Sequence, residues 1–330
     1  MKNNYYYRLW VILCILISVW MLVYADDVSD YALAGLKLWG CSVVPVLLPF
    51  IIISKLWIYF KVPDQLMRVF QRVFPGTPSL CVTLPIMISG LSAGFPVGAI
   101  FIRHYYKNRL LSKKAAESLL PLCSFASPMF IMGYVKKLVI EYMYSGHISK
   151  SMVYEWNVML LALYSPLLIL YCFRVMHKDF TVSAVGQVMK SQSASAVSEE
   201  EKSLNDIWNT SIEIIVTIGI YIMLLSIVFG FASGNPVFQN PVFRTGLACL
   251  EITAGCQYIV SMPAITNGLQ LLLLIIVLES GGLCVMAQIA SVIADTDLDL
   301  KAYGQTRLKC IILSITIYII ISMGFGSAYH

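Results

Sequence analysis

Long apolar stretches separated by short polar connections dominate this chain. In the first half they cover residues 9–24, 41–60, 79–102, 129–145 and 153–173. In the second half they cover residues 205–230, 245–262, 268–293 and 308–326. A helix needs roughly 20 apolar residues to cross the hydrocarbon core of a bilayer, and most of these stretches approach that length. The pattern predicts an all-α polytopic membrane protein with about 8–10 membrane segments.

The composition agrees with this class. Hydrophobic residues make up 58% of the chain and charged residues only 12%, against about 45–50% and 25% in soluble domains. We therefore expect lipid to surround most of the protein surface. The net charge of +5 is divided among short clusters between the apolar runs, which fits membrane topology and argues against a nucleic-acid partner.

The first apolar stretch, residues 9–24, predicts an anchor helix that begins in the cytoplasm. Two basic residues, Lys2 and Arg8, precede it, and three aspartates follow it at positions 26, 27 and 30. Alternatively, residues 23–25 resemble a signal-peptidase site, and cleavage after Ala25 would remove this helix.

A polar, serine-rich segment, residues 177–203, divides the rest of the chain in two. We therefore expect an anchor over 1–30, a first membrane repeat over 31–176, a cytoplasmic linker over 177–203, and a second membrane repeat over 204–330. In the first repeat, Pro45 and Pro49 predict a kink or split in residues 41–60. Residues 64–74 place apolar residues at helical spacing on one face and Arg68, Gln71 and Arg72 on the other, as a short surface helix does.

Two short segments suggest that the second half repeats the first. Residues 92–99 (SAGFPVGA) align with residues 280–287 (SGGLCVMA) at an offset of 188. The connection at 103–114 holds five Lys/Arg residues, whereas 291–302 holds one, with three aspartates. Because basic loops stay in the cytoplasm, we expect the two connections on opposite sides, as in the inverted repeats of transporters. Chance similarity is the alternative.

Small residues and prolines interrupt several of the apolar runs. An unwound helix inside a bilayer exposes N–H and C=O groups that must face protein, water or a solute. The interruptions therefore predict a solute site, with tight helix crossing as the structural alternative. The candidate solute-binding residues are Ser92, Gly94, Pro96, Gly98, Ser124, Ser127, Ser280, Gly281, Gly282 and Gln288.

Three glutamates, Glu213, Glu251 and Glu279, lie within or beside apolar runs. A charge at the centre of a bilayer costs about 2.5 kcal/mol or more, so such residues are usually paired or functional. Glu279 adjoins the break at residues 280–282 and is the strongest candidate for binding a coupling ion or proton. Glu251 is alternatively a helix cap.

Enzymatic and metal chemistry is not expected. Residues 90–94 (GLSAG) match the pattern of a nucleophilic serine, but that motif requires a strand, a turn and a histidine base. The four histidines all lie in polar connections, and the nine cysteines include no CxxC pair. We predict no catalytic residue, no metal and no cofactor.

Several segments, taken in order, resemble one known family. They are residues 47–50 (LLPF), 92–99, 127–130 (SPMF), 250–253 (LEIT) and 280–282 (SGG), with residues 298–303 (LDLKAY) after the last. Together they resemble the YlbJ-type sporulation integral membrane proteins, also called SpoVV, which carry two nucleoside-recognition gate modules. Residues 123–128 (CSFASP) depart from the family, which has an Asn-rich stretch there.

The resemblance implies a gate-containing transporter in the cell membrane, and in spore formers the movement of dipicolinate across a forespore membrane. Our first hypothesis is a carrier of a small anionic or heteroaromatic solute. A nucleoside-type transporter is one alternative. A non-transporting scaffold for spore-envelope assembly, in which the linker 177–203 matters most, is another. The expected partners are the solute and the lipid bilayer. Formation of a homo-oligomer is also compatible with this hypothesis.

Overall fold

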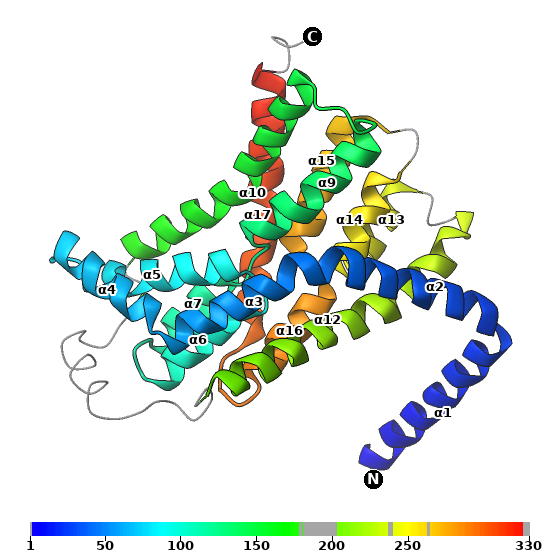
Figure 1. The fold of residues 1–330 in the computed structure, drawn as a ribbon, viewed down its shortest axis with the longest axis horizontal. Helices are drawn as coiled ribbons and strands as arrows, with labels where there is room; N and C mark the ends of the chain where they lie inside the picture. The colour runs from blue at the N-terminus through cyan, green and yellow to red at the C-terminus, as the bar shows by residue number, and fades with distance from the viewer. Residues whose placement is uncertain (1, 178–179, 181–202, 237–239, 263–264, 326–330) are drawn as a thin grey trace.

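The chain folds into helices joined by short connections (Figure 1). This computed structural model describes residues 2–177, 180, 203–236, 240–262 and 265–325. The first half comprises α1 (Lys2–Val23), α2 (Ala25–Leu38), η1 (Trp39–Val43), α3 (Val44–Tyr59), α4 (Val62–Val73), α5 (Pro78–Ala93), α6 (Val97–Lys107), α7 (Lys113–Cys123), α8 (Pro128–Phe130), η2 (Ile131–Val135), α9 (Lys136–Leu138), η3 (Val139–Met143) and α10 (Lys150–Met176). The second half comprises α12 (Leu204–Ser233), α13 (Pro241–Ala248), α14 (Ile252–Val260), α15 (Asn267–Ser280), α16 (Gly282–Ile293) and α17 (Leu300–Phe325).

Within the described residues, six helical stretches are long and apolar enough to cross a membrane. They are Ala25–Tyr59, Lys113–Met143, Lys150–Met176, Leu204–Ala232, Asn267–Ile293 and Leu300–Gly324. Two shorter apolar helices, Tyr7–Val23 and Pro78–Ala93, accompany them. The predicted all-helical, polytopic membrane class is confirmed.

Of the kink or split expected at Pro45 and Pro49, the split does not occur. A turn of π-helix, η1, lies directly before Pro45, and the helical path continues from α2 through α3. The wider π-turn accommodates the missing proline N–H without ending the helix. The predicted boundary between residues 30 and 31 falls within α2. The surface helix predicted over 64–74 is present as α4.

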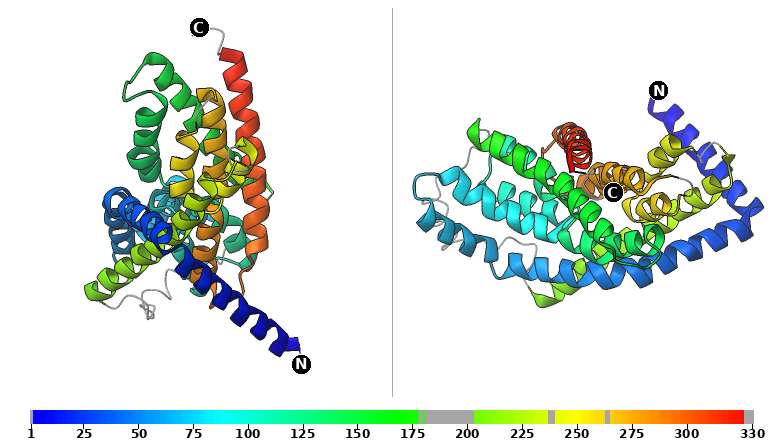
Figure 2. Two further views of the ribbon diagram at one scale, coloured as in Figure 1. Left: turned by 90° about the vertical axis from the view of Figure 1, so that its right-hand side faces the viewer. Right: turned by 90° about the horizontal axis from the view of Figure 1, so that it is seen from above.

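The long helix α2–α3 crosses α12 at close range. Gly219 lies against the ring of Trp39, and Gly230 lies against the ring of Tyr31. The Trp39 indole N–H also donates to the carbonyl of Ile215, at 2.9 Å. Small residues permit this approach, as they commonly do between membrane helices. These contacts join the two halves along one seam, while α1 extends away from the bundle (Figures 1 and 2).

Each half contains one helical hairpin and one interrupted helix. In the first half, α5 and α6 pack side by side, and α7 continues past a break into α8 and the helical turns up to Met143. In the second half, α13 and α14 form the hairpin, and α15 continues past a break into α16. The stretches 79–102 and 245–262 are therefore hairpins of short helices.

The offset of 188 residues aligns unlike elements. Residues 92–99 form the turn of the α5–α6 hairpin, whereas residues 280–287 form the break between α15 and α16. Glycine and serine suit both structures, because both need a residue with positive φ and a close backbone approach. The Gly/Ser motif therefore marks places where helices are interrupted. It does not show which interruption of the first half is equivalent to which interruption of the second half.

The connections 103–114 and 291–302 lie on the same side of the molecule, so the prediction of opposite sides is wrong. Arg103 donates to Asp295 at 2.7 and 2.5 Å, and Lys107 also pairs with Asp295. Lys113 and Tyr106 bind Asp297 at 3.2 and 2.5 Å. Hydrogen bonds from Arg103 and Lys107 hold the pKa of Asp295 well below its usual value. Acidic residues contribute little to membrane orientation, so the aspartates here pair with the basic loop instead.

A cross-linking experiment can test this shared side. With the native cysteines replaced, Arg103→Cys and Asp295→Cys in one chain are expected to be joined by a short bis-maleimide, because their side chains are in direct contact. The measurement is a mobility shift on gel electrophoresis of the membrane-embedded protein. His147, in the connection after Met143, provides the control: a His147→Cys/Asp295→Cys pair is expected to stay uncoupled. Cross-linking of only the control pair would contradict the fold.

The predicted linker, 177–203, lies almost entirely outside the described residues. Only His177, Phe180 and Ser203 are described. The Phe180 ring packs beside Tyr171 in α10, and Ser203 caps α12. The role predicted for this segment in the scaffold hypothesis stays a prediction.

Candidate functional site

The turn of the α5–α6 hairpin owes its shape to Gly94. This residue has φ 73° and ψ −169°, a conformation that only glycine adopts readily. The next residue, Phe95, donates its backbone N–H to the carbonyl of Phe125 at 3.2 Å. Pro96 lacks an N–H and precedes the first turn of α6. The hairpin turn is thus fastened to the break in the neighbouring interrupted helix.

Ser127 and Pro128 define the break between α7 and α8. The Ser127 hydroxyl accepts the backbone N–H of Phe130 at 3.2 Å, which makes Ser127 the N-cap of the new helix. Pro128 occupies the first helical position, where a missing N–H costs nothing. The Ser124 N–H makes the last helical bond of α7, to Leu120, and the Ser127 carbonyl accepts the first of the next helix, from Ile131, so residues 125–126 connect two helix ends.

Glu251 caps α14 at the turn of the second hairpin. Its carboxylate accepts the backbone N–H groups of Thr253 and Ala254, at 2.9 and 2.6 Å. The preceding carbonyls, of Cys249 and Leu250, accept the N–H groups of Leu283 and Cys284 at the start of α16, both at 3.1 Å. The second hairpin is therefore also fastened to the break beside it.

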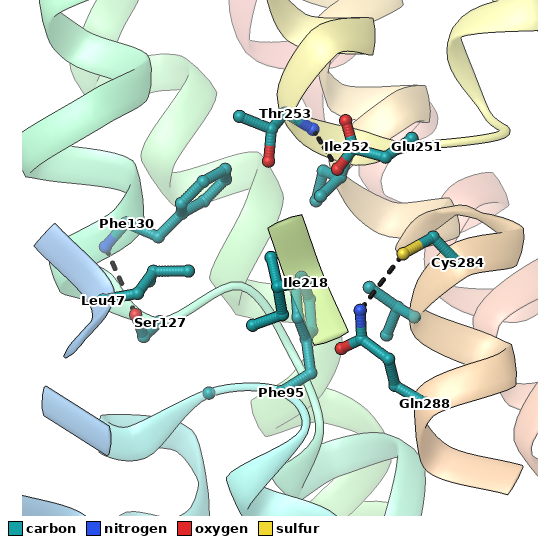
Figure 3. A pocket seen from close by; sticks show the side chains of 12 residues that line it. Leu47, Phe95, Ser127, Phe130, Ile218, Glu251, Ile252, Thr253, Cys284 and Gln288 are labelled. Atoms are coloured by element: carbon teal, nitrogen blue, oxygen red, sulfur yellow. Dashed lines mark hydrogen bonds between the residues drawn. The ribbon is translucent and has the colours of Figure 1, made fainter. Parts of the chain in front are cut away.

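A cavity lies where both hairpin turns and both breaks converge (Figure 3). The space between these elements amounts to about 400 Å³, a value that includes space open to the outside. The first half lines it with Leu47, Gly94, Phe95, Ser127 and Phe130, and the second half with Ile218, Glu251, Ile252, Thr253, Cys284, Val285 and Gln288. Each half thus contributes one long helix, one hairpin turn and one helix that starts after a break.

Aromatic and amide groups give the cavity its chemistry. Phe95 and Phe130 come from two elements of the first half, and Gln288 faces them from α16 (Figure 3). The Gln288 amide N–H donates to the sulfur of Cys284 at 3.1 Å, which turns its amide oxygen toward Phe95. All lining residues belong to the described part of the chain, and they include one carboxylate, Glu251, and no lysine or arginine.

Four of the predicted residues line this cavity: Gly94, Ser127, Gln288 and Glu251. Others shape the breaks from behind it. Gly98 packs on the carbonyl of Cys123, and the Ser92 and Ser280 hydroxyls bind carbonyls of their own helices, at 2.7 Å each. The remaining predicted residues of this kind, Pro96, Ser124, Gly281 and Gly282, lie in the turn or the breaks. Glu213 is exposed on the outer side of α12, away from the cavity.

Glu279, the predicted ion-coupling residue, is fully buried and does not line the cavity. It accepts a hydrogen bond from the Ser314 hydroxyl at 2.8 Å and lies 3.4 Å from a guanidinium nitrogen of Arg307. Arg307 was not among the residues predicted for the site, because it stands just before the apolar run 308–326, where a flanking charge is common. Its place within the long helix α17, at the start of that apolar run, was the available signal.

No group of three or more His, Cys, Asp or Glu side chains in the described ranges is arranged to hold a metal ion. The only carboxylate of the cavity, Glu251, already binds two backbone N–H groups. The lining instead offers aromatic rings, hydroxyls and an amide, which suit an organic solute.

The helices and their apolar surfaces define a multi-pass integral membrane protein in contact with lipid. The chain is a distant homologue of the "sporulation integral membrane protein YlbJ" of Bacillus subtilis (strain 168). The two are 24% identical over 306 residues, which covers 83% of this chain and 72% of the Bacillus protein. No family model matches the chain, and no solved structure matches it.

Proposed function

We propose that this protein is a carrier that binds a small solute in the cavity between its two halves. The observation that carries the proposal is the convergence of both hairpin turns and both helix breaks on one cavity, with matching elements from each half. Interrupted helices placed this way bring backbone polar groups to the cavity and supply a packing arrangement that can change, as transport requires.

The two halves are inverted repeats in this proposal. The pairs are α3 with α12, the α5–α6 hairpin with the α13–α14 hairpin, α7–η3 with α15–α16, and α10 with α17. The start of α7 and the end of α16 share the ion-paired side of the molecule, so α7–η3 and α15–α16 run in opposite directions. This pairing of elements replaces the alignment at an offset of 188 residues, and the two halves remain inverted relative to each other.

Basic residues orient the protein. The connection 103–114 holds five Lys/Arg residues, whereas the connections 144–149 and 261–266 at the opposite ends of the same helices hold none. Basic connections remain in the cytoplasm, so the ion-paired side is cytoplasmic. The N-terminus, at the far end of α1 from α2, then also starts in the cytoplasm.

The cavity favours a heteroaromatic solute. The phenyl rings of Phe95 and Phe130 can stack on a flat ring, and the Gln288 amide can bind a ring nitrogen or a substituent. A dianion such as dipicolinate would meet the Glu251 carboxylate without a basic partner, so it would enter together with protons or a cation. A neutral heteroaromatic compound such as a nucleoside needs no such partner.

Uptake into proteoliposomes tests the proposal. Radiolabelled dipicolinate and uridine, each with and without a pH gradient, are the probes. Gln288→Ala removes one hydrogen-bonding group from the cavity and is expected to raise the half-saturating concentration about 3- to 10-fold with little change in maximal rate. Ser291→Ala, an exposed position on the same helix, is the matched control and is expected to leave uptake unchanged. Identical kinetics in both variants would remove Gln288 from the solute site.

The relative's name adds a cellular test. Expression of this chain in a Bacillus subtilis strain that lacks YlbJ is expected to restore sporulation only if transport is retained. Restoration by a variant that cannot transport would instead favour the scaffold hypothesis.

A further inference from the structure

Arg307 of α17 connects the two interrupted helices directly behind the cavity. One guanidinium nitrogen donates to the carbonyl of Ser124 at 2.6 Å and to the carbonyl of Pro121, at the end of α7. The other lies 3.4 Å from the carboxylate of Glu279, at the end of α15. The same side chain therefore binds the helix end that precedes each break.

This arrangement is built into the core. The Arg307 side chain is 4% exposed and that of Glu279 0%, so neither is a snorkelling charge. The guanidinium also lies over the rings of Phe125 and Tyr303, at 4.7 and 5.4 Å. The C-terminal carbonyls of α7 carry the negative end of a helix dipole, and a buried cation complements them. Arg307 thus binds backbone carbonyls at the end of α7 and a side-chain carboxylate at the end of α15.

The segments that follow these two ends line the cavity. Ser127 and Phe130 come directly after the α7 break, and Cys284 and Gln288 come directly after the α15 break. The spacing of the two helix ends therefore sets the spacing of the two cavity walls. The planar fork of the guanidinium places two separate nitrogens on the carbonyls and on the carboxylate, whereas the ammonium of a lysine is one compact, flexible point of charge.

We propose that Arg307 is a positioning residue for the solute cavity, setting the distance between the two interrupted helices so that their walls form one site. This inference rests on the proposed function for its biological meaning, but its test needs no solute. Arg307 is not one of the lining residues and acts through the helix ends that it binds.

Cys284 serves as a built-in reporter of the cavity geometry. It lines the cavity and is 5% exposed, so its reaction with N-ethylmaleimide is expected to be slow in the native arrangement. In a chain whose other eight cysteines are replaced, Arg307→Met is expected to accelerate this reaction about fivefold or more. The measurement is the alkylation rate in proteoliposomes without solute, by mass spectrometry.

Arg174 provides the matched control. It binds the Ser118 carbonyl, earlier in α7 than the break, and the Thr306 hydroxyl, which adjoins Arg307 in α17. Arg174→Met is expected to leave the Cys284 rate unchanged. Equal acceleration in both variants, or none in Arg307→Met, would overturn the proposal. Accelerated Cys284 alkylation in Arg307→Met with no change in uptake would support this geometry and count against the proposed solute-binding function of the cavity.

Two further variants separate positioning from charge balance. Arg307→Lys keeps a cation beside Glu279 but loses the bridging fork, and it is expected to accelerate alkylation to an intermediate rate. The double variant Arg307→Met/Glu279→Met removes both charges, so it leaves no unpaired charge in the core. It therefore tests the inference even if the single variant folds poorly. Its Cys284 rate is expected to stay high. A native rate in the double variant would show that charge balance, not bridging, matters.

Discussion

Replacing Glu279 alone by methionine is expected to lower the free energy of unfolding by about 3–5 kcal/mol. The substitution leaves the Arg307 guanidinium buried with no counter-charge, and water cannot reach it without opening the helix bundle. The Ser314 hydroxyl also loses its acceptor. Because methionine has a similar volume, the loss reflects the unpaired charge and not a cavity.

Thermal unfolding in detergent, followed by fluorescence-detected size exclusion, measures this effect. The double variant Glu279→Met/Arg307→Met is the control, since removing both charges together is expected to recover most of the loss. Ser314→Ala removes only one hydrogen bond to a charged group and is expected to cost about 1.5–3 kcal/mol. A single variant as stable as the native chain would mean that Glu279 does not neutralise Arg307.

The places where helices are interrupted could be predicted from the sequence because their causes are local. Gly94 and Gly281 have positive φ, and the Ser127–Pro128 pair combines an N-cap with a proline at the first helical position. Each of these features depends on a few adjacent residues. The cavity lies among these breaks, and the binding of a solute there stays a prediction.

The pairing of these elements could not be predicted, because it depends on distant contacts. The turn at residues 249–251 has neither glycine nor proline and holds its shape through the Glu251 cap and through hydrogen bonds from Leu283 and Cys284. The two hairpins therefore looked unlike each other. A short Gly-Ser motif instead aligned one hairpin turn with a helix break.

The positions of several charged residues could not be predicted from the sequence, for a related reason. The aspartates at 295 and 297 looked like a loop on the far side of the membrane, but they neutralise Arg103, Lys107 and Lys113 on the same side. Arg307 looked like a flanking basic residue, but it is the centre of a buried network. Whether a charge faces solvent or a partner is decided by tertiary contacts, which a single sequence does not display.

A second large loss of stability is expected from substitutions of two glycines in the hairpins, Gly98 in α6 and Gly255 in α14. A Cβ at either position would collide with a backbone carbonyl of the facing helix, that of Cys123 or Ala248. Backbone atoms cannot move aside as a side chain can, so Gly98→Ala and Gly255→Ala are each expected to lower the free energy of unfolding by about 1–3 kcal/mol. Both are also expected to reduce uptake, because each hairpin turn lines the cavity.

Glycines in open space supply the control for this prediction. Gly246 in α13 and Gly304 in α17 would place a Cβ with nothing within 4 Å. There, alanine only removes backbone freedom from the unfolded chain, so the same substitution is expected to stabilise by about 0.5–1 kcal/mol. The sign of the effect should therefore reverse between the two pairs in thermal unfolding experiments. If all four variants were stabilised alike, the tight contacts that hold the hairpins against their neighbours would not exist, and the cavity between the halves would lose its walls.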